Sequence, residues 1–215
     1  MIIIVLFSII VGCKKDDSTS LPSVDNRASN MFSAIIGEST VKITEGIDDD
    51  LSYRCGSEGS TNFSLYNSFE RYYFSSSIVQ QLYIENKVYT KLSFGLTLGK
   101  LLDLRDEPNE SKILLDFLKL GKYPIHEYAE EGFAIFYYDN NGVKWKGITS
   151  DSIQNDGYVK IEEILSTEET ETSFEMKVKM SIESNLYHSV DSNTQEINKI
   201  RQGEYVGSFC ISKRD

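Results

Sequence analysis

Histidine is almost absent from this chain of 215 residues, which contains only His126 and His188. Neither belongs to a His-Glu-x-x-His motif, because no second histidine follows the pair His126-Glu127 at the required spacing. The chain also lacks a Gly-x-Ser-x-Gly nucleophile elbow and a Gly-x-x-x-x-Gly-Lys phosphate loop. We therefore predict no catalytic residues, no metal site and no cofactor, with ordinary surface or loop positions for both histidines.

Two acidic turns contain the oxygen ligands that calcium prefers, Asp48-Asp49-Asp50 and Asp139-Asn140-Asn141. Neither belongs to a twelve-residue calcium loop that ends in a glutamate. We interpret both segments as solvated turns.

Basic residues are in deficit, because 22 lysines and arginines face 33 aspartates and glutamates, which gives a net charge of −11. The phosphates of a nucleic acid would be repelled by such a surface. The sequence therefore argues against a nucleic-acid partner.

The apolar run at the N-terminus, residues 2–11, is interrupted only by Ser8. It is shorter than the roughly 20 residues that a membrane-spanning helix needs, but it has the length of a signal-peptide core. The segment Ile10-Val11-Gly12-Cys13 resembles the bacterial lipoprotein signal, in which the cysteine is acylated and becomes the new N-terminus. We expect residues 1–12 to be removed and Cys13 to carry the lipid; the alternative is a buried N-terminal strand or helix.

Residues 13–30 are mostly polar, show no hydrophobic periodicity, and are expected to form a flexible tether. The charged block after Cys13, Lys14-Lys15-Asp16-Asp17, resembles the exported lipoproteins of the Bacteroidota. In those proteins acidic residues after the cysteine can direct transport to the cell surface. The resemblance implies an outer-membrane location, either periplasmic or surface-exposed.

Only two cysteines remain once Cys13 is acylated, and they are Cys55 and Cys210. A compartment outside the cytoplasm permits disulfides. A bond between these two residues and two separate buried thiols are both compatible with the sequence.

Residues 31–215 are expected to form a single β-rich domain, because short stretches rich in aromatic and β-branched residues recur along the segment. The stretch Phe174 to Ile182 alternates strictly between apolar and polar residues, which is typical of a half-buried strand. Further strands are predicted at residues 31–36, 41–43, 62–67, 71–82, 87–98, 133–138, 143–146 and 205–211.

One helix is predicted between Pro108 and Gly121, with Ser111 as its N-cap and Gly121 as its end. The segment Asp139-Asn140-Asn141-Gly142 predicts a hairpin turn. The predicted fold is mainly β, an antiparallel β-sandwich or barrel with one helix near residues 110–120.

The C-terminal half resembles small Bacteroidota lipoprotein domains of unknown function, which implies a shared fold and an outer-membrane setting but no activity. The shared landmarks are Phe117, Gly121-Lys122-Tyr123, Asp139 with Gly142 and Trp145, Leu186-Tyr187, Gly203-Glu204-Tyr205 and Gly207-Ser208-Phe209.

Aromatic residues are plentiful, with 13 tyrosines, 11 phenylalanines and one tryptophan. Adjacent pairs on a strand must place one ring on each face. Core filling explains most of them, but exposed rings on a sheet can stack on sugars. The candidates for facing a ligand are Trp145, Tyr137, Tyr138, Tyr72 and Tyr73.

Three functions remain open. The first is a membrane-anchored, non-catalytic binding or interaction module whose partner is a glycan or an envelope protein. The second is a hydrolase acting on envelope or extracellular polysaccharides through two carboxylates from different strands. The third is a structural envelope component with a large exposed apolar patch.

Overall fold

The computed structural model describes residues 30–45, 51–63, 68–84, 87–103, 110–126, 132–147, 156–189 and 195–212. The predicted signal peptide, Cys13, Asp48-Asp49-Asp50 and all of the predicted tether except Asn30 lie outside these ranges. The elements are β1 Met31–Ile36, β2 Ser39–Thr44, β3 Leu51–Phe63, β4 Ser68–Ile84, β5 Lys87–Asp103, α1 Glu110–Phe117, β6 Gly121–Pro124, β7 Gly132–Tyr138, β8 Lys144–Lys146, β9 Tyr158–Glu169, β10 Ser173–Ser189 and β11 Gln195–Ser212.

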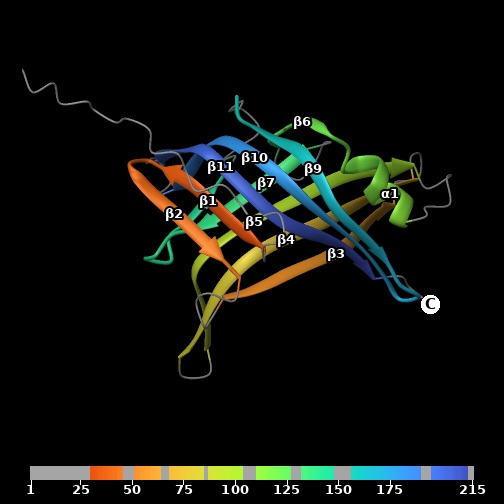
Figure 1. Ribbon diagram of the computed structural model, residues 1–215, viewed down its shortest axis with the longest axis horizontal. Coiled ribbons are helices and arrows are strands. Elements are labelled where there is room, and N and C mark those ends of the chain that lie inside the picture. Colours follow the sequence, from red (N-terminus) through yellow and green to blue (C-terminus); the bar gives the residue numbers. More distant parts are fainter. Residues whose placement is uncertain are drawn as a thin grey trace, which may run out of the picture.

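The strands form one antiparallel sheet that curls into a half-barrel (Figure 1). The main path through the sheet is β2-β1-β11-β10-β8-β7-β5-β4-β3. The sheet forks at β10, whose first part pairs with β9 and whose last part pairs with β8. Strand β9 pairs in turn with β6. These findings confirm the predicted mainly β fold, and α1 is the one helix within the described ranges.

The inner face of β10 shows why the alternating pattern predicted its strand. Phe174, Met176, Val178, Met180 and Ile182 are all buried in the core, whereas the polar residues between them face outward. Burying an aliphatic or aromatic side chain contributes roughly 1.5–3 kcal/mol, so the strand is held mainly by this one face.

Aromatic side chains connect the two walls of the curled sheet. The ring of Phe32 on β1 stacks on that of Phe94 on β5, with centroids 3.6 Å apart. Phe94 also contacts Tyr205 on β11, whose hydroxyl lies 2.6 Å from the hydroxyl of Ser76 on β4. Because β1 and β11 belong to one wall and β4 and β5 to the other, these contacts fill the interior of the half-barrel.

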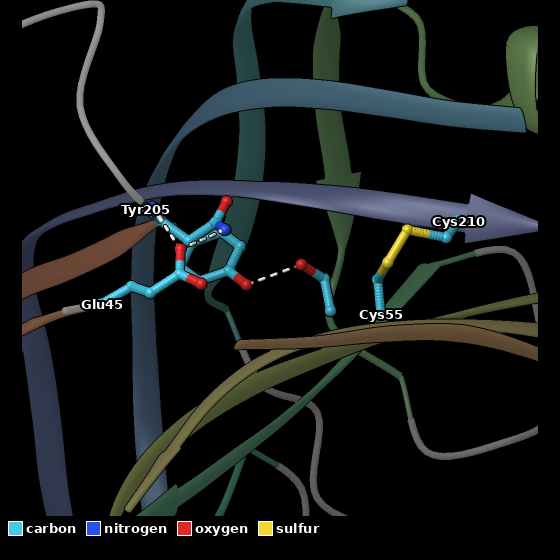
Figure 2. Close-up of a disulfide and its surroundings, with 6 residues drawn as sticks. Glu45, Cys55, Tyr205 and Cys210 are labelled. Carbon is cyan, nitrogen blue, oxygen red and sulfur yellow. Dashed lines mark hydrogen bonds between the residues drawn. A yellow bond between two sulfur atoms is a disulfide. The ribbon is translucent and has the colours of Figure 1, made fainter. Parts of the chain in front are cut away.

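A disulfide links Cys55 on β3 to Cys210 on β11. Of the two alternatives that the sequence allowed, a bond or two separate thiols, the structure contains the bond. Figure 2 shows this bond together with Tyr205, whose hydroxyl is directed toward the side of the disulfide. Strand β3 is an edge of the sheet and is not a hydrogen-bonded neighbour of β11 in the described strand order. The Cα atoms are 5.3 Å apart, close to the spacing of paired residues on adjacent strands. The disulfide therefore fastens the far edge of the curled sheet to β11.

Strand β11 is bent by a bulge, because its pairing with both β1 and β10 shifts register near Gln202, which has a φ of 50°. Bulges increase the local twist and bend of a sheet. Further along β11, the ring of Tyr205 folds over Gly207, where an added Cβ would lie 2.4 Å from Cε1 of that ring. Only glycine leaves room for the tyrosine to lie flat along its own strand.

Helix α1 is shorter than predicted. It spans Glu110–Phe117, so Ser111 lies within its first turn and Gly121 begins β6 rather than ending the helix. The early end has a local cause, because the hydroxyl of Tyr123 accepts from the Lys119 backbone N–H and is within hydrogen-bonding distance of the Phe117 carbonyl. Leu114, Phe117 and Leu118 are buried and pack α1 against the core.

Several strands differ from the sequence-based prediction. The predicted strand at residues 62–67 is the end of the longer β3, and the last four of these residues lie outside the described ranges. Strands β6 and β9 were not predicted at all. Most of β9 is exposed beyond Ile161, so its residues lack the apolar alternation that marks a half-buried strand.

Within the described ranges, no helix is long and apolar enough to cross a lipid bilayer.

Candidate functional site

A pocket of about 360 Å³ opens at one end of the half-barrel. Helix α1 covers the opposite end, at the right in Figure 1. The pocket lies between the β1–β2 hairpin and the β7–β8 hairpin, with β5 and β11 contributing to its wall. Its lining residues are Ile36, Ser39, Thr40, Val41, Lys42, Leu92, Tyr137, Asp139, Asn140, Asn141, Trp145 and Asn198.

Asp139 organises the β7–β8 hairpin on one side of the pocket. Its Oδ1 accepts hydrogen bonds from the backbone N–H groups of Asn141 and Val143, each at 2.9 Å. Its Oδ2 accepts from the indole Nε1 of Trp145 at 3.4 Å. One carboxylate therefore fixes both the loop backbone and the orientation of the tryptophan.

The turn of this hairpin lies where the sequence predicted it. The Gly142 N–H donates to the carbonyl of Asp139, and Gly142 has a φ of 75°. Asn141 does not have a positive φ. This is a three-residue loop in which the glycine occupies the left-handed position, rather than a two-residue turn with two positive φ angles.

The β1–β2 hairpin forms the other side of the pocket and is attached to β11. The Gly37 N–H donates to the carbonyl of Lys199 at 3.2 Å, and the Arg201 guanidinium donates to the carbonyl of Gly37. The side chain of Asn198 packs against Gly37, because a Cβ added there would lie 2.9 Å from the Asn198 Oδ1. Asn198 pairs with the fully buried Leu186 on β10, so it shares the inner face of the sheet.

Tyr137 and Trp145 form the aromatic part of the pocket wall. They are directly opposite each other on β7 and β8, and both are buried, with 5% and 7% of their surface exposed. Burial, together with the nearby negative charge of Asp139, raises the pKa of Tyr137 to about 12. The phenol therefore remains protonated at neutral pH. The indole also contacts the ring of His188, with centroids 5.4 Å apart.

The other three aromatic candidates lie elsewhere. Tyr138 points to the opposite face from Tyr137, where the ammonium of Lys144 lies 5.7 Å from its ring centroid. Tyr73 is half-buried on β4, and the side chain of Tyr72 lies outside the described residues. The structure thus brings Tyr137 and Trp145 together at the pocket, while neither Tyr138 nor Tyr73 belongs to its lining.

The two histidines occupy separate positions. The His126 backbone N–H donates to the Phe133 carbonyl, and the His188 Nδ1 donates to the Lys144 carbonyl at 3.0 Å. Among the residues that the structure describes, no group of three or more histidine, cysteine, aspartate or glutamate side chains is arranged to hold a metal ion.

No sequence pattern marks the polar residues that the β1–β2 hairpin and β11 contribute to the pocket. Ser39, Thr40, Lys42 and Asn198 belong to no motif, and over 150 positions separate the first from the last. The only local signal was the Asp139 to Trp145 segment, which supplies the other side of the pocket.

Comparisons with protein families, with curated proteins and with solved structures find no match for this chain.

Proposed function

We propose that this chain is a bacterial lipoprotein of the outer membrane whose β-domain is a non-catalytic binding module. In this proposal the chain is cut before Cys13 and anchored through acyl chains on that cysteine. The domain would then face the periplasm or the cell exterior and bind a glycan or an envelope protein. The anchor is supported by Ile10-Val11-Gly12-Cys13 and the apolar run before it.

The pocket between the two hairpins is the main structural support for a binding role. Its volume of about 360 Å³ lies within the range of small-molecule sites, roughly 300–1,000 Å³. Aromatic and apolar side chains line it together with several polar groups, as is usual for such sites.

The chemistry of the lining favours binding over hydrolysis. Glycoside hydrolysis generally uses two carboxyl groups on either side of the scissile bond. Asp139 is the one carboxylate among the lining residues that the structure describes, and it already accepts three hydrogen bonds. Among these described residues, no second carboxyl group lines the pocket to take the acid or base role.

The anchor is tested by expressing the full chain in a bacterial host and labelling it with an alkyne analogue of palmitate. We expect label on the natural chain and none on Cys13→Ala. The Cys55→Ser/Cys210→Ser double variant controls for loss of other thiols and should remain labelled. An unlabelled natural chain, or a labelled Cys13→Ala variant, would contradict the anchor.

The binding role is tested with the full chain purified in detergent. It is incubated with insoluble polysaccharides and, separately, with solubilised envelope proteins, and both the bound fraction and the released reducing ends are measured. We expect retention on one class of partner without an increase in reducing ends. Release of reducing ends, or no retention on either class, would overturn the proposal.

A further inference from the structure

The lining of the pocket divides into an apolar wall and a rim of uncharged polar groups. Ile36, Val41, Leu92, Tyr137 and Trp145 supply the apolar wall. The uncharged polar groups are the hydroxyls of Ser39 and Thr40 and the side-chain amides of Asn140, Asn141 and Asn198. The pocket therefore offers C–H and ring surface on one side and hydrogen-bonding groups on the other.

Amides are suited to a particular class of ligand. Each side-chain amide has a carbonyl that accepts and an NH₂ group that donates, and each sugar hydroxyl also donates and accepts. A pyranose ring combines such hydroxyls with C–H faces that pack against apolar and aromatic side chains. Three amides beside an apolar wall match this combination.

The charges at the pocket disfavour ionic ligands. Within the described part of the chain, the lining holds one ammonium, that of Lys42, and one carboxylate, that of Asp139. The Asp139 carboxylate already accepts hydrogen bonds from two backbone N–H groups and from the indole N–H. These bonds stabilise its charge without a cationic ligand. The net charge of −11 opposes the approach of anions to the protein in general.

Both sides of the pocket are held in place by hydrogen bonds within the protein. Asp139 fixes the loop that carries Asn140 and Asn141, and the Gly37 turn is bonded to β11 beside Asn198. A rim that is already ordered loses little conformational entropy when it binds, which increases affinity.

We propose that this pocket binds an uncharged sugar residue of an envelope or extracellular glycan, with Asn198 and Asn140 bonding its hydroxyls and Trp145 lying beside its ring. The inference rests on the proposed binding function and specifies the ligand class of the same site.

Tryptophan fluorescence provides a readout confined to the pocket, because Trp145 is the only tryptophan in the chain. The full chain in detergent is titrated with uncharged methyl glycosides and N-acetylglucosamine, and with glucuronate and glucosamine as charged sugars of similar size. We expect a saturable change in emission with at least one uncharged sugar and weaker binding of both charged sugars.

The residues are tested with an Asn140→Ala/Asn198→Ala double variant, which should weaken binding of that sugar about tenfold through the loss of its hydrogen bonds. Asn185→Ala is the matched control, because Asn185 pairs with Lys199 and so faces the other side of the sheet from Asn198. It should bind the sugar as tightly as the natural chain.

Other outcomes separate this inference from the proposed function. Tighter binding of glucuronate or glucosamine would overturn the ligand class, and unchanged affinity in the double variant would overturn the pocket assignment. Retention of an envelope protein with no response to any sugar would overturn the inference and leave the binding function standing. Failure of both assays would overturn both.

Discussion

The hydroxyl oxygens of Tyr205 and Ser76 lie 2.6 Å apart in the interior and join β11 to β4 across the half-barrel. Both residues are completely buried. Tyr205 also contacts Phe94 and folds over Gly207, so a single tyrosine connects both walls of the curled sheet and covers its own strand. Ser76 pairs with Cys55 on β3, which places this hydrogen bond beside the disulfide (Figure 2).

Removing the Tyr205 hydroxyl with Tyr205→Phe should lower the free energy of unfolding by about 1 kcal/mol, because a buried hydrogen bond is lost while the ring remains. Urea unfolding of Tyr205→Phe, Ser76→Ala and the double variant measures the interaction. The double variant should be less destabilised than the sum of the single changes. Strict additivity would show that the two hydroxyls are not coupled.

Replacing both cysteines in Cys55→Ser/Cys210→Ser should lower the free energy of unfolding by about 2–5 kcal/mol, since the bond closes a long loop. Reduction of the natural chain with dithiothreitol should produce a similar shift of the urea midpoint. The same reductant should leave the double variant unchanged, which controls for other effects of the reagent. A double variant as stable as the natural chain would contradict the role given to the disulfide.

Asp139→Ala should destabilise the protein by about 1–3 kcal/mol, because two backbone donors and the indole lose a charged acceptor. The emission of Trp145 should shift to longer wavelength as the hairpin loosens. Asp116→Ala is the matched control, because Asp116 makes only an exposed ion pair with Lys119 among the contacts described, and such pairs contribute roughly 0–1 kcal/mol. Equal effects of the two variants would contradict the structural role of Asp139.

Stability should fall as the pH rises from about 10 to about 12, because the pKa of Tyr137 is raised to about 12. In that window the unfolded tyrosine has lost its proton while the folded one keeps it. The unfolded state therefore binds fewer protons, and the free energy of unfolding decreases with pH. Unfolding of Tyr137→Phe should depend less steeply on pH than that of the natural chain. Parallel pH profiles of the two proteins would show that Tyr137 does not contribute to the pH dependence of stability.

Local patterns predicted several individual elements whose sequence shows a clear apolar alternation or a compact apolar stretch. The alternation from Phe174 to Ile182 predicted part of β10, and the apolar stretches at residues 31–36 and 41–43 predicted β1 and the middle of β2. The end of α1 was not predicted, because it depends on the side chain of Tyr123 returning to the helix, and apolar periodicity does not report such a contact.

The curl of the sheet and the pocket depend on contacts between distant segments. The sequence does not specify that β11 lies between β1 and β10, because strands that pair can be far apart along the chain. Without knowledge of this strand order, the position of Asn198 beside the Gly37 turn and opposite the Asp139 loop could not be predicted. The two buried aromatics of the pocket were proposed from sequence, but the polar groups around them required the topology.

The disulfide also constrains when the fold can be completed. Its cysteines are separated by 155 positions, and Cys210 lies near the end of the last strand. During synthesis, the partner of Cys55 does not exist until β11 has been made. Strands β3, β4 and β5 can pair earlier as consecutive hairpins, but the attachment of β3 to β11 must follow the synthesis of all the strands between them.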